Sequence, residues 1–122
     1  MSDIQTFRGL RYSLGQDTDL DELLCPPYDI IPPDLQTQLY QRSPYNVVRL
    51  ELGERRPTDT AQDNRYARSG TLLSKWQDQG VLVRDTEPAY YLVQHTFTAE
   101  GQQRSRLELM GCVALEPYDR RV

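Results

Sequence analysis

The sequence predicts an α+β fold with a mostly antiparallel sheet of about five strands and two helices packed on one face. Three observations predict this class: two segments carry apolar residues at helical spacing, several short segments alternate apolar and polar residues, and glycine or proline separates most of them. The chain has 122 residues, of which 38% are hydrophobic. This is enough for one modest core, and we predict a single domain over residues 1–122.

A proline-rich arm leads into the first predicted helix. Four of the eight residues from Pro26 to Pro33 are prolines, which predicts a stiff, non-helical segment in which a cis bond is an open alternative. Pro33 suits the first position of a helix, Leu35 and Leu39 share one of its faces, and Ser43-Pro44 ends it.

The second predicted helix spans residues 65–79. Tyr66, Leu73 and Trp76 fall on one stripe of this helix, which favours core packing for all three. Gly80 follows the helix and suits a left-handed cap.

The strongest strand signal is residues 45–52, where Val48, Leu50 and Leu52 point to one side and Gly53 ends the run. Gly111 is expected as a bulge or a close-packing site. The other predicted segments are a short strand over 6–12 bulged at Gly9, an acidic loop or single helical turn over 17–24, an exposed loop over 54–64, a short strand over 81–84, and a hairpin of 89–97 with 103–116 around residues 98–102.

Composition excludes several classes of partner. The net charge of −4 at pH 7 argues against nonspecific nucleic-acid binding. No run of about 18 apolar residues and no export signal occurs, so we expect a cytoplasmic protein with no membrane partner. Cys25 and Cys112 lack metal-type spacing and are expected as reduced, buried thiols, while His95 is expected on an apolar face rather than in a metal or catalytic site.

Tyr28 and Asp29 are the candidate catalytic residues. A rigid arm presents their phenol and carboxylate with little entropy lost on binding. Asp29 could hold a metal or act as a base toward a substrate hydroxyl, and Tyr28 could stack or donate a hydrogen bond. The alternative is a structural turn in which Tyr28 packs and Asp29 caps backbone amides.

Arginine dominates the basic residues, since Lys75 is the single lysine among 14. Arg8, Arg11 and Arg49 are the candidate cofactor-binding residues and could converge on an anionic ligand. Ion pairs with some of the 18 acidic residues are the plainer alternative.

Short motifs occur in a particular order: Phe7–Tyr12, Pro26–Ile31, Pro44–Leu50, Tyr66-Ala67, Leu73 with Trp76, Gly80–Leu82, Asp85, Pro88–Tyr91, Gln94 and Leu115–Tyr118. The ordered series covers almost the whole chain and resembles the start of the uncharacterised prokaryotic family called domain of unknown function 1015. The resemblance implies members several times longer, with a His-Glu-containing segment after the position of Val122. This chain would then be an N-terminal piece, and its ending over residues 116–122, which has no polar tail, agrees with that expectation.

A looser resemblance concerns Gly53-Glu54-Arg55-Arg56. This run is similar to the Gly-Glu-Arg-Arg box that meets phosphate in the partition-protein-B and sulfiredoxin group of nucleotide-binding domains. Arginine's planar fork suits phosphate oxygens, and glycine lets a backbone approach closely. A helix begins at once in that group, whereas Pro57 and a polar stretch follow here, so a solvated charged loop is the favoured interpretation.

Two hypotheses follow for function. The first is a nucleotide- or phosphate-using enzyme that acts on a small hydroxyl metabolite, with Tyr28, Asp29 and Arg49 forming one wall and the rest of a longer chain completing it. A nucleotide with Mg²⁺ is the compatible cofactor, a small anionic metabolite or nucleotide is the compatible partner, and residues 1–122 alone are expected to be inactive. The alternative is a non-catalytic ligand-binding or scaffold domain whose proline arm docks against the rest of the protein.

Overall fold

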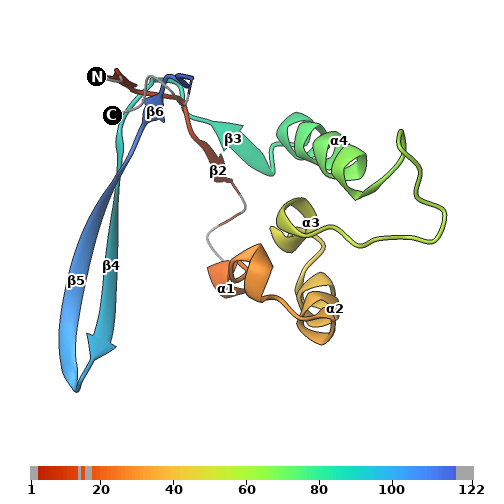
Figure 1. Cartoon of the computed structure of the whole chain (residues 1–122), viewed down its shortest axis with the longest axis horizontal. Helices are drawn as coiled ribbons and strands as arrows, with labels where there is room; N and C mark the ends of the chain where they lie inside the picture. The colour runs from red at the N-terminus through yellow and green to blue at the C-terminus, as the bar shows by residue number, and fades with distance from the viewer. Residues whose placement is uncertain (1–2, 14, 16–17, 118–122) are drawn as a thin grey trace. The chain divides into compact units, whose positions relative to one another are not determined.

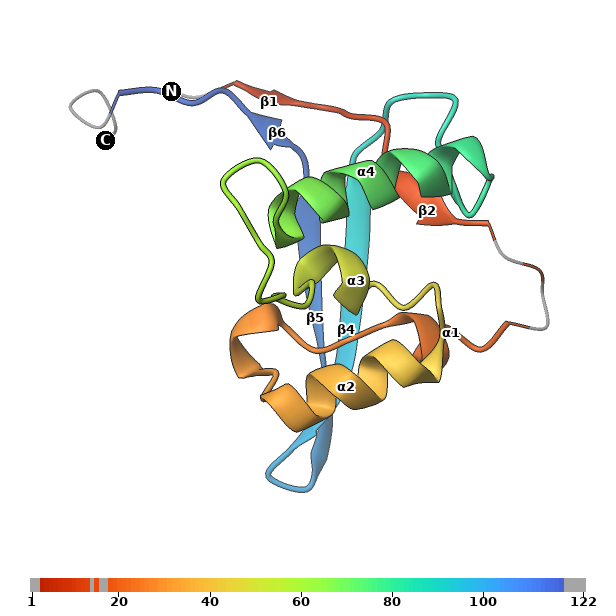
Figure 2. The ribbon, with the colours of Figure 1, turned by 90° about the vertical axis from the view of Figure 1, so that its right-hand side faces the viewer.

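The structure, a computed structural model, describes residues 3–13, 15 and 18–117 and confirms the α+β class. Figure 1 and Figure 2 show two views of the ribbon. The helices are α1 (Leu20–Leu23), a 3-10 turn η1 (Tyr28–Ile30), α2 (Pro33–Arg42), α3 (Val48–Glu51) and α4 (Arg65–Asp78). The strands are β1 (Ile4–Gln5), β2 (Leu10–Tyr12), β3 (Leu82–Arg84), β4 (Tyr91–Ala99), β5 (Gln102–Met110) and β6 (Cys112–Val113).

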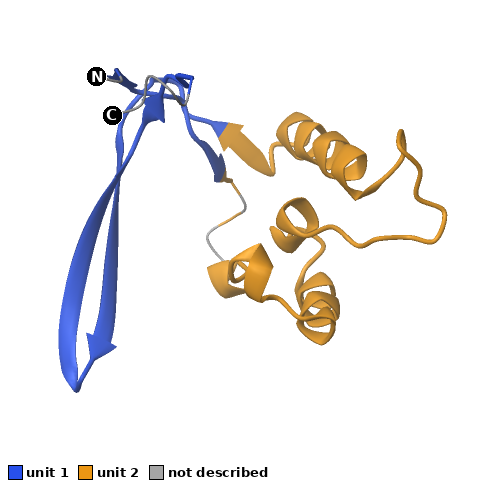
Figure 3. Ribbon diagram, viewed as in Figure 1, with its two compact units in different colours: residues 1–11, 84–122 blue, residues 12–83 orange. Residues whose placement is uncertain are grey.

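The chain divides into two compact units, coloured separately in Figure 3. Unit 1 comprises Met1–Arg11 and Arg84–Val122, and unit 2 comprises Tyr12–Val83. A single domain over residues 1–122 stays a prediction. The predicted ending over residues 118–122, and residue 17 of the predicted acidic segment, lie outside the described residues.

The prediction of one five-stranded sheet is wrong. The described strands form three two-stranded sheets, β1 with β6, β2 with β3, and β4 with β5. Strand β1, which the sequence did not predict, pairs antiparallel with β6, with Ile4 opposite Val113. The segment expected to supply the strongest strand, residues 45–52, contains helix α3 instead, so it cannot join the short strands into a larger sheet.

Asn46 explains why residues 45–52 do not extend as a strand. Its side-chain Oδ1 accepts from the N–H of Val48 at 2.9 Å, and its carbonyl accepts from the N–H of Arg49 at 3.2 Å. These two hydrogen bonds stabilise a turn directly before α3, which opposes the β preference of the valines that follow.

Asn46 is also fully buried, at 0% exposure. Its Nδ2 donates to the carbonyls of Glu22, at 2.8 Å, and Leu24, at 3.0 Å. The side chain therefore joins the end of α1 to the start of α3, and all its buried polar atoms have partners.

The core of unit 2 gathers on α4. Trp76 is 2% exposed and packs with Val81 and Leu82, while five partly buried residues, Tyr12, Tyr45, Leu50, Leu72 and Leu73, surround this cluster. In Figure 2, α3 lies between α2 and α4, and it contacts both helices.

Both long helices confirm the sequence pattern. Helix α2 begins at Pro33 and ends at Arg42 before Ser43, and α4 is followed by Gly80 with φ of 74°. The single helical turn is present as α1, capped by the Asp19 side chain, which accepts from the Asp21 N–H. The core position predicted for Tyr66 is wrong, because its side chain is 74% exposed.

The proline arm is extended only in part. Pro27 and Pro32 have the extended backbone that proline favours, but the residues between them form the 3-10 turn η1, so the prediction of a wholly non-helical arm is wrong. The described residues contain no cis peptide bond.

The hairpin of unit 1 confirms the predicted pair of strands with a tighter turn. Ala99 pairs with Gln102, and the two residues between them, Glu100 and Gly101, have φ of 54° and 76°. Positive φ at both positions is the geometry of the two-residue turn that matches strand twist, and glycine adopts it without steric cost. His95 is half exposed, 3.5 Å from Glu108.

Asp85 links the N-terminal segment of unit 1 to the start of β4. Its carboxylate binds Arg11 through two contacts, of 2.7 and 2.8 Å, and accepts from the Tyr91 hydroxyl. Tyr91 in turn accepts from the Gly9 N–H at 2.7 Å. A side chain at Gly9 would begin 2.8 Å from the Tyr91 oxygen, so this close approach requires glycine.

Replacing Asn46 tests how much its side chain contributes to the stability of unit 2. Asn46→Ala removes the partner of the Glu22 and Leu24 carbonyls and of the buried Val48 N–H, and we expect it to lower the free energy of unfolding by about 3 kcal/mol. Urea unfolding followed by far-ultraviolet circular dichroism measures the change. Asn64, the other asparagine of the chain, caps α4 with the same side chain, and Asn64→Ala should cost about 1 kcal/mol. Equal costs for the two variants would show that the buried amide of Asn46 contributes no more than an ordinary helix cap.

The ionisation of Asp85 gives a second test. The hydrogen bonds from Arg11 and then Tyr91 lower the pKa of Asp85 below its ordinary value of 3.8. Because the folded pKa is the lower one, ionised Asp85 stabilises the fold above about pH 3.8, and this contribution is lost as the pH falls through the folded pKa.

In Arg11→Gln we expect the titration midpoint of Asp85, followed by NMR of its carboxyl carbon, to rise toward 3.8. Arg84→Gln is the control, since Arg84 donates to the Arg8 carbonyl. A midpoint that does not move in Arg11→Gln would refute the assigned cause.

Candidate functional site

Three adjoining hollows meet at Gly53 and Arg65 of unit 2, and we call them together the Gly53 groove. The Tyr28 lobe, of about 440 Å³, is lined by Tyr28, Leu50, Glu51, Leu52, Tyr66 and Ser69 as well as the two shared residues. The Arg55 lobe, of about 430 Å³, adds Ile31, Pro33, Gln36, Glu54 and Arg55. The Arg56 lobe, of about 200 Å³, adds Tyr40, Arg49, Arg56, Arg68 and Leu72.

The backbone at the centre of the groove is held from two helices. From α2, Gln36 Nε2 donates to the Leu52 carbonyl at 2.9 Å, and the Tyr40 hydroxyl accepts from the Glu54 N–H at 3.0 Å. From α4, Arg68 donates to the Glu54 carbonyl at 2.9 Å. Residues 52–54 therefore have a fixed path, although they belong to no helix or strand.

Two of the five arginines that line the groove are held in structural contacts. Arg68 binds Asp59 at 2.7 Å and keeps the pKa of that carboxyl below its ordinary value. Arg49 donates to the Tyr40 carbonyl at 2.9 Å and lies 4.4 Å from the centre of the Tyr40 ring, while its buried Nε has no partner within the described chain. These two arginines brace the wall of the groove.

Arg55 and Arg56 are different, because both are exposed. Across the described residues, neither guanidinium forms an ion pair or a hydrogen bond within the protein. Only two glutamates, Glu51 and Glu54, line the groove with the five arginines. The groove thus has a surplus of positive charge in a chain whose net charge is −4.

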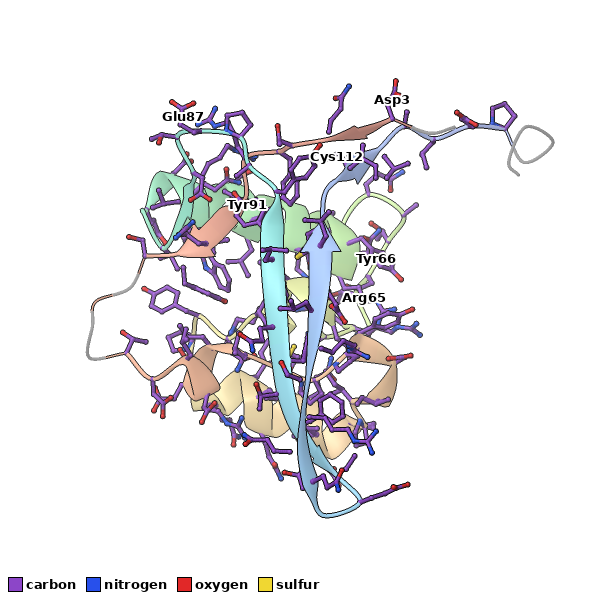
Figure 4. The ribbon with its side chains drawn as sticks, turned by 90° about the vertical axis from the view of Figure 1, so that its left-hand side faces the viewer. Asp3, Arg65, Tyr66, Glu87, Tyr91 and Cys112 are labelled. Carbon is purple, nitrogen blue, oxygen red and sulfur yellow. The ribbon has the colours of Figure 1, made fainter. Side chains whose placement is uncertain are left out.

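Arg65 and Tyr66 lie side by side at the start of α4, as Figure 4 shows. Arg65 donates to the Tyr66 hydroxyl at 3.0 Å, and its guanidinium lies 5.0 Å from the centre of the ring. The hydrogen bond from Arg65, together with the positive charge of its guanidinium, lowers the pKa of Tyr66.

The two predicted catalytic residues are neighbours in η1 but do not share the groove. Tyr28 is 61% exposed and lines the Tyr28 lobe. Asp29 is exposed and lines none of the three lobes. No described backbone amide donates to its carboxylate. The catalytic roles of both residues stay predictions.

The three predicted anion-binding arginines occupy different places. Arg49 lines the groove in unit 2, in the contacts with Tyr40 described above. Arg8 and Arg11 belong to unit 1, where Arg8 donates to the Asp85 carbonyl at 2.6 Å and Arg11 pairs with the Asp85 carboxylate. Ligand binding by these residues stays a prediction.

Sequence reasoning missed Arg65 and Tyr66 as groove residues, and it favoured a solvated charged loop for Arg55 and Arg56. The signal was present in the Gly53–Arg56 run, but no pattern indicated that the start of α4 would face it. Tyr66 was assigned to the core because it shares a helical stripe with Leu73 and Trp76, and a shared stripe does not guarantee shared burial at the first turn of a helix.

Whether the cysteine and carboxylate side chains of the described residues could bind a metal ion depends on how they are grouped. Both cysteines are free; Cys112 is exposed, so its predicted burial is wrong, and burial raises the pKa of the partly buried Cys25. Among the residues that the structure describes, no group of three or more histidine, cysteine, aspartate or glutamate side chains could hold a metal ion. None of the helices described has the length and apolar character needed to cross a membrane.

Removing the Tyr40 hydroxyl oxygen tests whether it helps to hold the backbone of residues 52–54. Tyr40→Phe keeps the ring beneath Arg49 but removes the acceptor for the Glu54 N–H, and we expect about fivefold faster hydrogen exchange at that amide. Tyr66→Phe is the matched control, because its hydroxyl accepts from a side chain rather than from backbone. Unchanged exchange at Glu54 in Tyr40→Phe would contradict the assigned support.

Comparison with known proteins identifies one relationship. Comparison with curated proteins and with solved structures gives no match. Residues 4–122 match the sequence profile of a family described as "Protein of unknown function (DUF1015)". This match confirms the resemblance carried by the ordered motifs from Phe7 to Tyr118. Since it spans nearly the whole sequence, the chain belongs to the DUF1015 family.

Proposed function

We propose that unit 2 binds a small phosphate-bearing metabolite in the Gly53 groove, as the phosphate-binding part of a nucleotide- or phosphate-using enzyme that acts on a small hydroxyl metabolite. The observation that carries the proposal is the pair of arginines, Arg55 and Arg56, which line the groove and are exposed, and whose guanidinium groups form no hydrogen bond or ion pair in the described protein. A guanidinium presents several donors in a planar fork that matches phosphate oxygens.

The shape of the groove supports the same ligand class. Arg55 and Arg56 line two separate lobes that share Gly53, Glu54 and Arg65. A phosphate between these lobes would meet guanidinium groups from more than one side. The carboxylate of Glu54 lines both lobes too, so it disfavours an anion placed against it and favours one held near the arginines.

In this proposal Tyr28 contacts the substrate inside the groove, and Asp29, which lies outside the three lobes, acts on a substrate hydroxyl that extends from it. Tyr28 lines the Tyr28 lobe and can stack on a ligand or donate a hydrogen bond to it. Asp29 is exposed next to it in η1, and its carboxylate has no hydrogen-bond partner in the described chain, so it remains available to accept the proton of a substrate hydroxyl.

A non-catalytic ligand-binding or scaffold domain is the second candidate. The contacts of Arg8 and Arg11 with Asp85, and of Arg49 with Tyr40, favour it, since each gives a predicted ligand-binding arginine a structural role. Such a domain would still bind an anion through Arg55 and Arg56, but it would turn over no substrate.

Inorganic pyrophosphate tests the phosphate-binding groove by titration calorimetry on the full chain. We expect the double variant Arg55→Gln, Arg56→Gln to bind about tenfold more weakly than the wild type. The matched control is Arg104→Gln, Arg106→Gln, which removes the same charge from β5 and should bind as the wild type does. No binding by the wild type, or equal weakening by both double variants, would refute the proposal.

A further inference from the structure

The Tyr28 lobe differs chemically from the two lobes beside it. Two tyrosines from different elements, Tyr28 of η1 and Tyr66 of α4, line it together with the apolar side chains of Leu50 and Leu52. Both tyrosine side chains are more than half exposed, at 61% and 74%, so neither belongs to the core. Exposed aromatic rings lining a hollow of about 440 Å³ suit a planar aromatic ligand group, which gains from stacking on them.

The polar groups of this lobe favour ligand atoms that donate hydrogen bonds. Glu51 is exposed on α3, and its carboxylate forms no hydrogen bond or ion pair in the described chain. Ser69 donates its hydroxyl hydrogen to the Arg49 carbonyl at 3.2 Å, which leaves the oxygen free to accept. An ionised carboxylate and a hydroxyl used in this way are both acceptors, and an amino group on an aromatic ring is their natural complement.

The lobe is continuous with the arginines, because Gly53 and Arg65 line all three hollows. A ligand can therefore place an aromatic group at Tyr28 and Tyr66 and reach Arg55 and Arg56 with an attached phosphate. Arg65 lines both the Tyr28 lobe and the Arg55 lobe and adds a positive charge where they adjoin.

We infer that the ligand of the Gly53 groove is a nucleotide whose base carries an amino group. The base stacks on Tyr28 and Tyr66, its amino group donates to Glu51, and its phosphates bind Arg55 and Arg56. This inference rests on the proposed function, which requires only a phosphate-bearing ligand.

Two matched pairs of ligands test the inference by calorimetry on the full chain. CDP and UDP differ by an amino group or a carbonyl on the base, and ADP and IDP differ in the same way. We expect CDP and ADP to bind about tenfold more tightly than UDP and IDP because of the amino group. All four nucleotides should bind more tightly than pyrophosphate, because their bases stack on the tyrosines. Glu51→Gln should abolish the preference within each pair, whereas Glu87→Gln, an exposed glutamate of unit 1, should keep it.

The tyrosines are tested by comparing alanine with phenylalanine. Tyr28→Ala and Tyr66→Ala should weaken ADP binding about tenfold more than they weaken pyrophosphate binding, and Tyr28→Phe and Tyr66→Phe should retain the affinity for ADP. If pyrophosphate binds but nucleotides bind no more tightly, or if the pairs show no preference, the inference fails and the phosphate-binding groove stands. If pyrophosphate does not bind, the proposed function fails with it.

Discussion

The buried amide of Asn46 is the contact on which the rest of unit 2 depends. Its side chain reaches two carbonyls at the end of α1 and one N–H at the start of α3, and the Val47 N–H adds a bond of 2.7 Å to the Leu23 carbonyl. A buried amide without partners is costly, so only one arrangement of these segments satisfies it. That arrangement fixes where the proline arm leaves α1 and where α3 begins, and α4 supplies the remaining residues of the Tyr28 lobe.

The Gly53 groove combines a fixed floor with exposed cations. Gln36, Tyr40 and Arg68 hold the backbone of residues 52–54 by three hydrogen bonds from helices on either side. The guanidinium groups of Arg55 and Arg56 follow directly on this held segment. A ligand that binds them does not have to order the backbone beneath, which reduces the entropic cost of binding. The proline arm plays a similar part for Tyr28, since Pro27 and Pro32 restrict the chain on both sides of η1.

Local signals predicted helices and turns well, and tertiary contacts decided the rest. Pro33, Ser43 and Gly80 marked the limits of α2 and α4 because their effects act within a few residues. The prediction of a strand at Val48 and Leu50 failed because the turn that the Asn46 side chain stabilises before α3 depends on a burial that no spacing reveals. For the groove, the Gly53–Arg56 run could be read from the sequence, but the contribution of Arg65 and Tyr66 could not, since it depends on how α4 packs against α3.

The place of Trp76 has a practical consequence for studies of this protein. It is the single tryptophan of the chain, and it lies in unit 2 with the Tyr12 and Tyr45 rings 6.2 and 6.0 Å away. Its fluorescence therefore reports on the packing of unit 2 around this side chain. Comparing this built-in optical reporter with a probe of the whole backbone would reveal whether the two units unfold as one.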